Sequence, residues 1–182
     1  MPAPAVPAAR GVPQPTRRRL LQLGAGAAVA LALAGTGAAL WSPGWREGRL
    51  SPTARALFAS VGGVVLEGSL PADPVDRERA LSGMVERLEA ALAGLPHATR
   101  AQLSQLLGLL QIGPARRWLC GLDKPWTDAA PHDVERALVR MRTADDALRQ
   151  QVYQALRSLV SASYFSAPET WAQLGYLGPV AL

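Results

Sequence analysis

The side chains that most often carry chemistry are few and scattered in this sequence. There is one cysteine, Cys120, and there are two histidines, His97 and His132. A single thiol cannot form an intramolecular disulfide, and these three residues do not stand at a spacing that binds zinc. His97 follows a proline and His132 stands at a predicted helix start, where histidines are usually exposed or cap the helix. We therefore expect no metal site in this chain.

Catalytic motifs are also missing from the sequence. Asp145 and Asp146 form an acidic pair near a predicted helix N-terminus, where negative charge is favoured by the helix dipole. We find no Gly-x-Ser-x-Gly elbow, dinucleotide fingerprint, Walker loop or haem-attachment motif. Cys120 is expected to be buried and inert, the alternative being a reactive thiol. From its own residues, the chain is expected not to be an enzyme and to hold no cofactor.

The most specific pattern is an arginine cluster that precedes a long apolar run. It resembles the twin-arginine export signal, in which paired arginines stand between a Ser or Thr and two bulky apolar residues. Only Gln22 departs from the usual pattern. The alternative is a basic arm that lies outside a membrane helix. The signal residues are Thr16, Arg17, Arg18, Leu20 and Leu21.

Residues 23–40 contain no charged side chain and are rich in Ala and Gly. The run is long enough to span a bilayer, but it is only weakly hydrophobic, which suits a removable signal better than an anchor. Gly37 and Ala39 supply the small residues that cleavage after Ala39 requires. We therefore expect residues 1–39 to be a signal peptide and residues 40–182 to be the mature domain. Trp41 and Trp45 favour the alternative, an uncleaved membrane anchor.

The high isoelectric point arises from the leader. The whole chain has 19 Lys and Arg against 14 Asp and Glu, and four of the arginines precede residue 20. The remaining 15 cations face 14 acids, so the mature part is nearly neutral. Nucleic-acid binding is not expected, because it requires many cations on one face.

The rest of the chain forms the domain that the leader would export. Its apolar residues recur at helical spacing. Ser51 and Asp73, each followed by proline, predict two helix starts. Gly62 and Gly63 interrupt the first helix and predict a close contact between helices. The leucine-rich segment 103–112 predicts the central buried helix.

Further elements are expected after that segment. Residues 116–120 predict a short turn or helix, and another helix begins at Pro131. Thr143 is the predicted cap of a long helix that reaches Tyr164. No stretch alternates as a strand does, so no sheet is expected. The predicted fold is an all-α single bundle of about five helices, followed by an irregular aromatic tail.

The tail, residues 164–179, concentrates four aromatic residues with glycine and proline. A short helix is expected from Pro168, and it cannot continue through Gly175. Aromatic side chains on such a segment either close over the domain's own core or present anchors to a partner. The sequence leaves both readings open.

Residues 126–179 resemble the gluconate 2-dehydrogenase subunit 3 family. The resemblance rests first on the twin-arginine leader. It rests also on residues of the long helix: Leu148, Arg149, Tyr153, Leu156, Ser163, Tyr164 and Phe165. Its most specific part is Pro168-Glu169-Thr170-Trp171 followed by Leu174-Gly175-Tyr176-Leu177-Gly178-Pro179. Family members have proline where this chain has Leu177.

The resemblance implies a non-catalytic accessory subunit that is exported folded to the periplasm. Its partner would be a large flavoprotein of the glucose-methanol-choline type, which binds FAD and passes electrons to a cytochrome c or a quinone. The alternative is a free-standing periplasmic or membrane-tethered helical protein that binds a ligand or acts as a chaperone. The partner-binding candidates that the resemblance implies are Tyr164, Phe165, Trp171, Gly175, Tyr176, Gly178 and Pro179.

Overall fold

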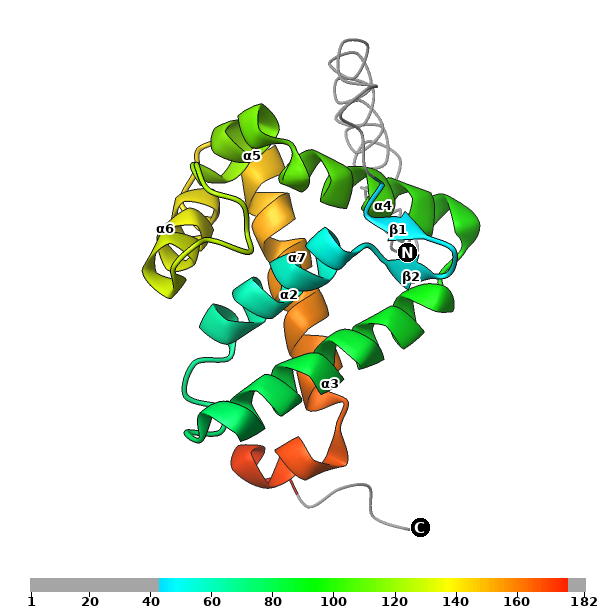
Figure 1. Ribbon diagram of the computed structural model, residues 1–182, viewed down its shortest axis with the longest axis vertical. Helices are drawn as coiled ribbons and strands as arrows, with labels where there is room; N and C mark the ends of the chain where they lie inside the picture. The colour runs from blue at the N-terminus through cyan, green and yellow to red at the C-terminus, as the bar shows by residue number, and fades with distance from the viewer. Residues whose placement is uncertain (1–42, 177–182) are drawn as a thin grey trace, which may run out of the picture. The chain divides into compact units, whose positions relative to one another are not determined.

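Helices make up most of residues 43–176, the part of the chain that the computed structural model describes (Figure 1). The predicted all-α bundle is confirmed. Residues 43–176 contain six α-helices where about five were predicted, because residues 113–120 form two full helical turns and not only a short turn. The helices are α2 (Pro52–Val65), α3 (Pro74–Ala93), α4 (His97–Gln111), α5 (Gly113–Cys120), α6 (Pro131–Arg142), α7 (Ala147–Phe165) and the 3-10 helix η3 (Pro168–Leu174).

The first two helices begin where the sequence predicts. The Ser51 hydroxyl accepts a hydrogen bond from the Ala54 amide at 3.2 Å. The Asp73 carboxylate accepts bonds from the amides of Val75 and Asp76, both at 3.0 Å. Each cap satisfies amides that have no partner inside the helix, and the proline that follows each cap has no amide hydrogen to satisfy.

The predicted cap of the long helix was wrong. Asp146 caps α7, where its carboxylate accepts from the Arg149 amide at 2.8 Å. Thr143 instead ends α6, and its hydroxyl donates to the Val139 carbonyl at 3.0 Å. A threonine can bond back to the carbonyl four residues earlier, whereas an aspartate at a helix N-terminus also gains from the dipole.

The central helices of the bundle are α2 and α7. Helix α7 packs against α2, α3 and α6, and α2 also packs against α3, α4 and α6. In Figure 1, α7 runs behind α2 through the middle of the helices. The prediction that residues 103–112 form the central helix was wrong. Helix α4 packs mainly on α5, β1 and α2, and only Leu107, Gly108 and Leu110 are buried.

The predicted close contact between helices is confirmed at Gly62 and not at Gly63. A Cβ atom on Gly62 would lie 2.7 Å from Met84 Cε and 3.1 Å from Leu81 Cδ2, both on α3. A Cβ on Gly63 would meet nothing within 4 Å. The missing side chain at position 62 therefore lets α2 and α3 approach each other.

A small hairpin precedes the helices, although no sheet was predicted. Strands β1 (Trp45–Arg46) and β2 (Arg49–Leu50) pair antiparallel, with Arg46 opposite Arg49. Glu47 and Gly48 form the turn with φ values of 50° and 83°. Two residues with positive φ suit the twist of a tight hairpin. Strands of two residues are too short to show alternation in the sequence.

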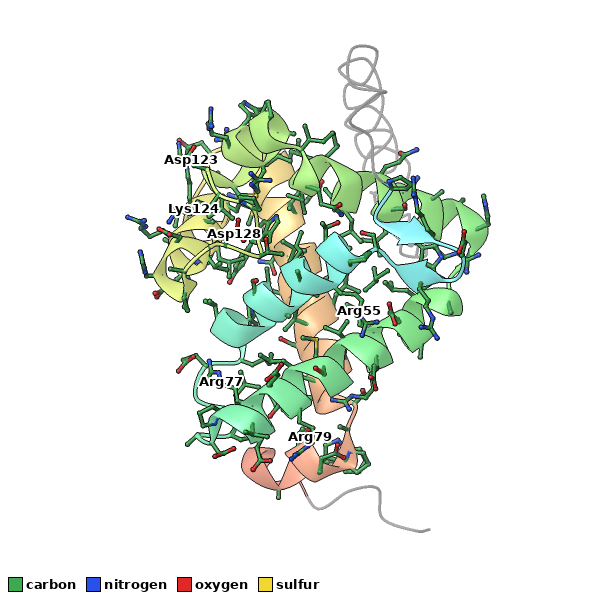
Figure 2. All side chains as sticks on the ribbon, in the orientation of Figure 1. Arg55, Arg77, Arg79, Asp123, Lys124 and Asp128 are labelled. Carbon is green, nitrogen blue, oxygen red and sulfur yellow. The ribbon has the colours of Figure 1, made fainter. Side chains whose placement is uncertain are left out.

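A buried arginine organises the loop between α5 and α6. Arg116 donates to the carbonyls of Gln111 at 2.9 Å, Asp123 at 3.0 Å and Leu122 at 3.2 Å. Burial lowers the pKa of its guanidinium from the usual value. The Trp126 indole, also buried, donates to the Leu110 carbonyl at 2.9 Å. The charged side chains Asp123, Lys124 and Asp128 lie along this loop (Figure 2).

Across residues 43–176, no helix combines the length and the apolar character needed to cross a membrane. The predicted signal residues and the apolar run that follows them lie outside the described residues, as do Gly178 and Pro179.

Candidate partner-binding surface

The aromatic tail starts at the last turn of α7 and continues as η3. Pro168 occupies the first turn of η3, and Gly175 ends it in the left-handed conformation with φ of 68°. The predicted short helix from Pro168 is confirmed, as is its termination at Gly175. A left-handed residue after a helix favours glycine, which has no Cβ to clash.

Tyr164 lies in the core and not on the surface. It is 2% exposed, and its hydroxyl donates to the Ser69 carbonyl at 2.7 Å. The Phe165 ring meets it edge-on, with centroids 5.1 Å apart. Tyr164 therefore closes over the domain's own core and does not present an anchor to a partner. The surface open to a partner therefore begins beyond it.

Trp171 is half-buried and held by its own indole. The indole N–H donates to the Phe165 carbonyl at 2.9 Å, which ties η3 back to the end of α7. The buried Thr170 hydroxyl donates to the Ala167 carbonyl at 2.7 Å. Trp171 therefore has a fixed ring orientation, with part of its surface against the domain and part facing solvent.

Tyr176 stands next to Trp171 and faces outward. The two ring centroids lie 5.3 Å apart with an interplanar angle of 61°, a favourable edge-on geometry. The Tyr176 amide donates to the Trp171 carbonyl at 3.1 Å, and the side chain remains 51% exposed. The left-handed Gly175 makes this return of the chain possible. Trp171, Gly175 and Tyr176 thus form one surface, which we call the aromatic corner.

The residues considered for chemistry at the sequence level do not converge. Cys120 is buried, as predicted, and burial raises the pKa of its thiol from 9.0 to about 12. His97 and His132 are both exposed, at the starts of α4 and α6. Within residues 43–176, no cluster of three or more His, Cys, Asp or Glu side chains could hold a metal ion.

One exposed aromatic residue was missed at the sequence level. Trp118 on α5 is 57% exposed, and the Arg149 guanidinium lies 5.1 Å from its ring centroid. Arg149 also donates to the Trp118 carbonyl at 3.0 Å. The run Arg116-Arg117-Trp118 was the available signal. This stacked pair is a second place where an aromatic ring is held in a fixed orientation.

Open depressions occur on the described surface. One, of about 460 Å³, is lined by Arg142, Tyr153 and neighbouring glutamines of α7. A second, of about 310 Å³, lies where Trp45, His97 and Arg100 meet. Ser104 and Gln105 also line the second depression. The Ser104 hydroxyl accepts from the Trp45 amide at 3.1 Å and donates to the Trp45 carbonyl at 3.5 Å, so the backbone of the hairpin occupies it.

The residues of the tail motif that lie on an accessible surface are therefore those of the aromatic corner. Its three residues belong to the tail motif that the sequence shows between Pro168 and Pro179. The comparisons with protein-family models, curated proteins and solved structures found no match to this chain.

Proposed function

We propose that this chain is a non-catalytic small subunit that escorts, exports and assembles a periplasmic flavin-dependent alcohol or sugar dehydrogenase. The partner would be a large subunit of the glucose-methanol-choline type, and it would hold the FAD. A cytochrome c subunit is a further partner of such a complex. The chain itself would carry the export signal and a docking surface.

The observation that carries the proposal is the aromatic corner. Trp171, Gly175 and Tyr176 occur in the order and spacing of the family motif. Tyr176 projects from a backbone held by two hydrogen bonds, from the Gly175 amide to the Ala172 carbonyl at 3.2 Å and from the Tyr176 amide to the Trp171 carbonyl at 3.1 Å. Interfaces gain most from large aromatic anchors, and anchors that are already ordered lose little entropy on binding. An exposed tyrosine on such a support suits a docking role better than a sealing role.

The export pattern supports the same conclusion. Twin-arginine export carries folded proteins, which serves a protein that must bind its cofactor or its partner before it crosses the membrane. This small domain shows no cofactor motif of its own. A signal on one subunit would export the whole complex if the flavoprotein had no signal.

A second candidate is a free-standing periplasmic or membrane-tethered helical protein. The hydrogen bonds of Tyr164 and Trp171 favour it, because the Tyr164 hydroxyl and the Trp171 indole N–H both donate to carbonyls of the domain itself. Tyr176 distinguishes the two candidates, since it covers little of the core and would have no evident use in a free-standing protein.

Co-purification tests the proposal directly. The full chain, tagged at its C-terminus and expressed with its neighbouring genes, should bring down a large protein with a flavin absorption spectrum. The double variant Arg17→Lys/Arg18→Lys should leave both proteins in the cytoplasm. A colourless monomer would contradict the proposal. So would a variant that abolishes export of this chain while the flavoprotein still reaches the periplasm.

A further inference from the structure

The hairpin and the start of α4 together form a cationic surface. Within residues 43–176, Arg46, Arg49 and Arg100 form no ion pair. Arg46 and Arg49 are exposed and Arg100 is half-buried. Helix α4 has no acidic residue, so Glu47 is the only acid on the hairpin or on this helix. We call the surface of Trp45, Arg46, Arg49, His97 and Arg100 the hairpin face.

The pairing of the hairpin places two like charges together. Arg46 lies directly opposite Arg49 in the register. Like charges in this position destabilise a strand pair, and no acidic neighbour in the described ion pairs relieves them. An external anion would relieve the repulsion. Glu89 on α3 also reaches the hairpin, where its carboxylate accepts from the Leu50 amide at 2.9 Å, but its ion pair is with Arg55 at 2.6 Å and not with Arg46 or Arg49.

Trp45 and Arg100 complete the hairpin face. The Arg100 guanidinium lies 5.9 Å from the centroid of the Trp45 ring, and it donates to the Ala93 carbonyl at 2.8 Å. Both residues, with His97, line the depression of about 310 Å³. An indole beside unpaired cations is the combination found at membrane interfaces, where the ring lies at headgroup level and arginines meet phosphates.

The chain enters the domain at this same face and is clamped there. The Gly44 amide donates to the Ser104 carbonyl at 3.1 Å, and its carbonyl accepts from the Ser51 amide at 2.8 Å. The Trp45 amide donates to the Ser104 hydroxyl at 3.1 Å. A Cβ on Gly44 would lie only 2.3 Å from Leu107 Cβ, so only glycine allows this close approach. The position of the backbone at residue 44 is therefore fixed on α4.

Chain length then limits how far the hairpin face can lie from a bilayer. The run rich in Ala, Gly and Leu ends at residue 40, and the four residues from there to Gly44 span at most about 14 Å when extended. The headgroup region on each side of a bilayer is roughly 5–8 Å thick. Whenever the run occupies the bilayer, the hairpin face can reach the headgroups.

We propose that the hairpin face binds the headgroups of anionic phospholipids beside the point where the apolar run meets the membrane. The interaction holds during export, and it persists where the run is retained as an anchor. It orients the domain so that the hairpin and α4 face the bilayer and η3 remains accessible. The proposal does not depend on the flavoprotein partner.

Site-specific labelling of the full chain in vesicles tests this orientation. Ala98→Cys places a label on the exposed part of α4, and Ala172→Cys places a matched label on η3. Cys120 is buried and stays unlabelled. With phosphatidylglycerol in the vesicles, a quencher attached to lipid headgroups should quench the label at position 98 strongly and that at position 172 weakly. In phosphatidylcholine alone, the difference should disappear.

Charge variants separate lipid binding from simple tethering. Arg46→Gln/Arg49→Gln should lower the ratio of docked to undocked domain by roughly thirtyfold, since each arginine near an anionic surface contributes about 1 kcal/mol to docking. The control Arg142→Gln/Arg157→Gln removes the same charge from α6 and α7 and should leave the quenching unchanged. Equal quenching at positions 98 and 172 would overturn the proposal. Quenching at position 98 that survives the hairpin variant would also overturn it.

Discussion

The Tyr164 hydroxyl donates a hydrogen bond to the Ser69 carbonyl at 2.7 Å, across 95 residues of chain. This bond joins the last turn of α7 to the turn between α2 and α3. Tyr164 is nearly fully buried, so its ring also contributes apolar contact at this junction. The aromatic tail is therefore anchored to the first half of the domain before η3 begins.

Tyr164→Phe should destabilise the domain by about 1 kcal/mol, because the Ser69 carbonyl loses its donor in a partly buried place. Tyr164→Ala should cost about 3–5 kcal/mol, because it also leaves a cavity. Urea unfolding followed by circular dichroism measures both. Tyr153→Phe is the control, because the structure shows no hydrogen bond from its hydroxyl within residues 43–176. Equal effects of the two Tyr→Phe changes would contradict the assignment.

Gly44→Ala should destabilise the domain by about 1–3 kcal/mol, because its Cβ would overlap the Leu107 Cβ on α4. Gly63→Ala is the matched control. Its Cβ would meet nothing, and alanine in a helix is about 1 kcal/mol more favourable than glycine. The two variants should therefore shift the free energy of unfolding in opposite directions. Stabilisation by both would show that the hairpin is not clamped to α4.

Arg116→Met should destabilise the domain by about 2–4 kcal/mol, because three carbonyls lose a charged donor. Arg117→Met should change stability by less than about 0.5 kcal/mol, since Arg117 is exposed and its pair with Asp123 is at the surface. Thermal unfolding of both variants compares the two neighbouring arginines. Similar stability of the two variants would argue against the role of Arg116 in holding the loop.

The free energy of unfolding should fall as the pH rises from about 9 towards 12, because burial raises the pKa of the Cys120 thiol from 9.0 to about 12. In this range the unfolded chain loses the thiol proton while the folded chain keeps it, so deprotonation favours unfolding. Other groups titrate there too, and the difference between the native chain and Cys120→Ala isolates the thiol. Parallel pH profiles of the two chains would contradict the pKa shift.

Tyr176→Ala should lower the affinity for the proposed flavoprotein by roughly tenfold or more, as expected for an aromatic anchor. It should change domain stability by less than about 0.5 kcal/mol, because the side chain is half-exposed. Trp118→Ala is the control, since it removes an exposed aromatic from α5. Pull-down of the flavoprotein with each variant gives the comparison. Equal binding by both would remove the aromatic corner from the proposed interface.

The sequence predicted helix starts better than it predicted helix neighbours. Ser51 and Asp73 act within one turn, so their role can be read from a few adjacent letters. The placement of α4 depends on the topology of the whole chain. Leu103, Leu106 and Leu109 make α4 apolar, yet they are only half-buried because fewer helices surround it. Periodicity shows which part of a helix is apolar and not how many elements cover it.

The tail could have been divided into core and surface from the sequence. Val152, Leu156, Val160 and Tyr164 follow each other at intervals of four, and all four are buried. Tyr176 has no such series, because it follows the left-handed Gly175. The role of Arg116 in holding the loop could not have been predicted, because its three acceptors are backbone carbonyls, which every sequence contains.

The central position of α7 has a consequence for the order of events during synthesis. Helices α2 and α3 are made early, but much of the surface against which they pack belongs to α7, residues 147–165. These contacts have high sequence separation, so the helices cannot complete their core while the chain is still growing. The domain must therefore fold after nearly all of its residues have left the ribosome. Truncation before α7 should leave the earlier helices open to proteases.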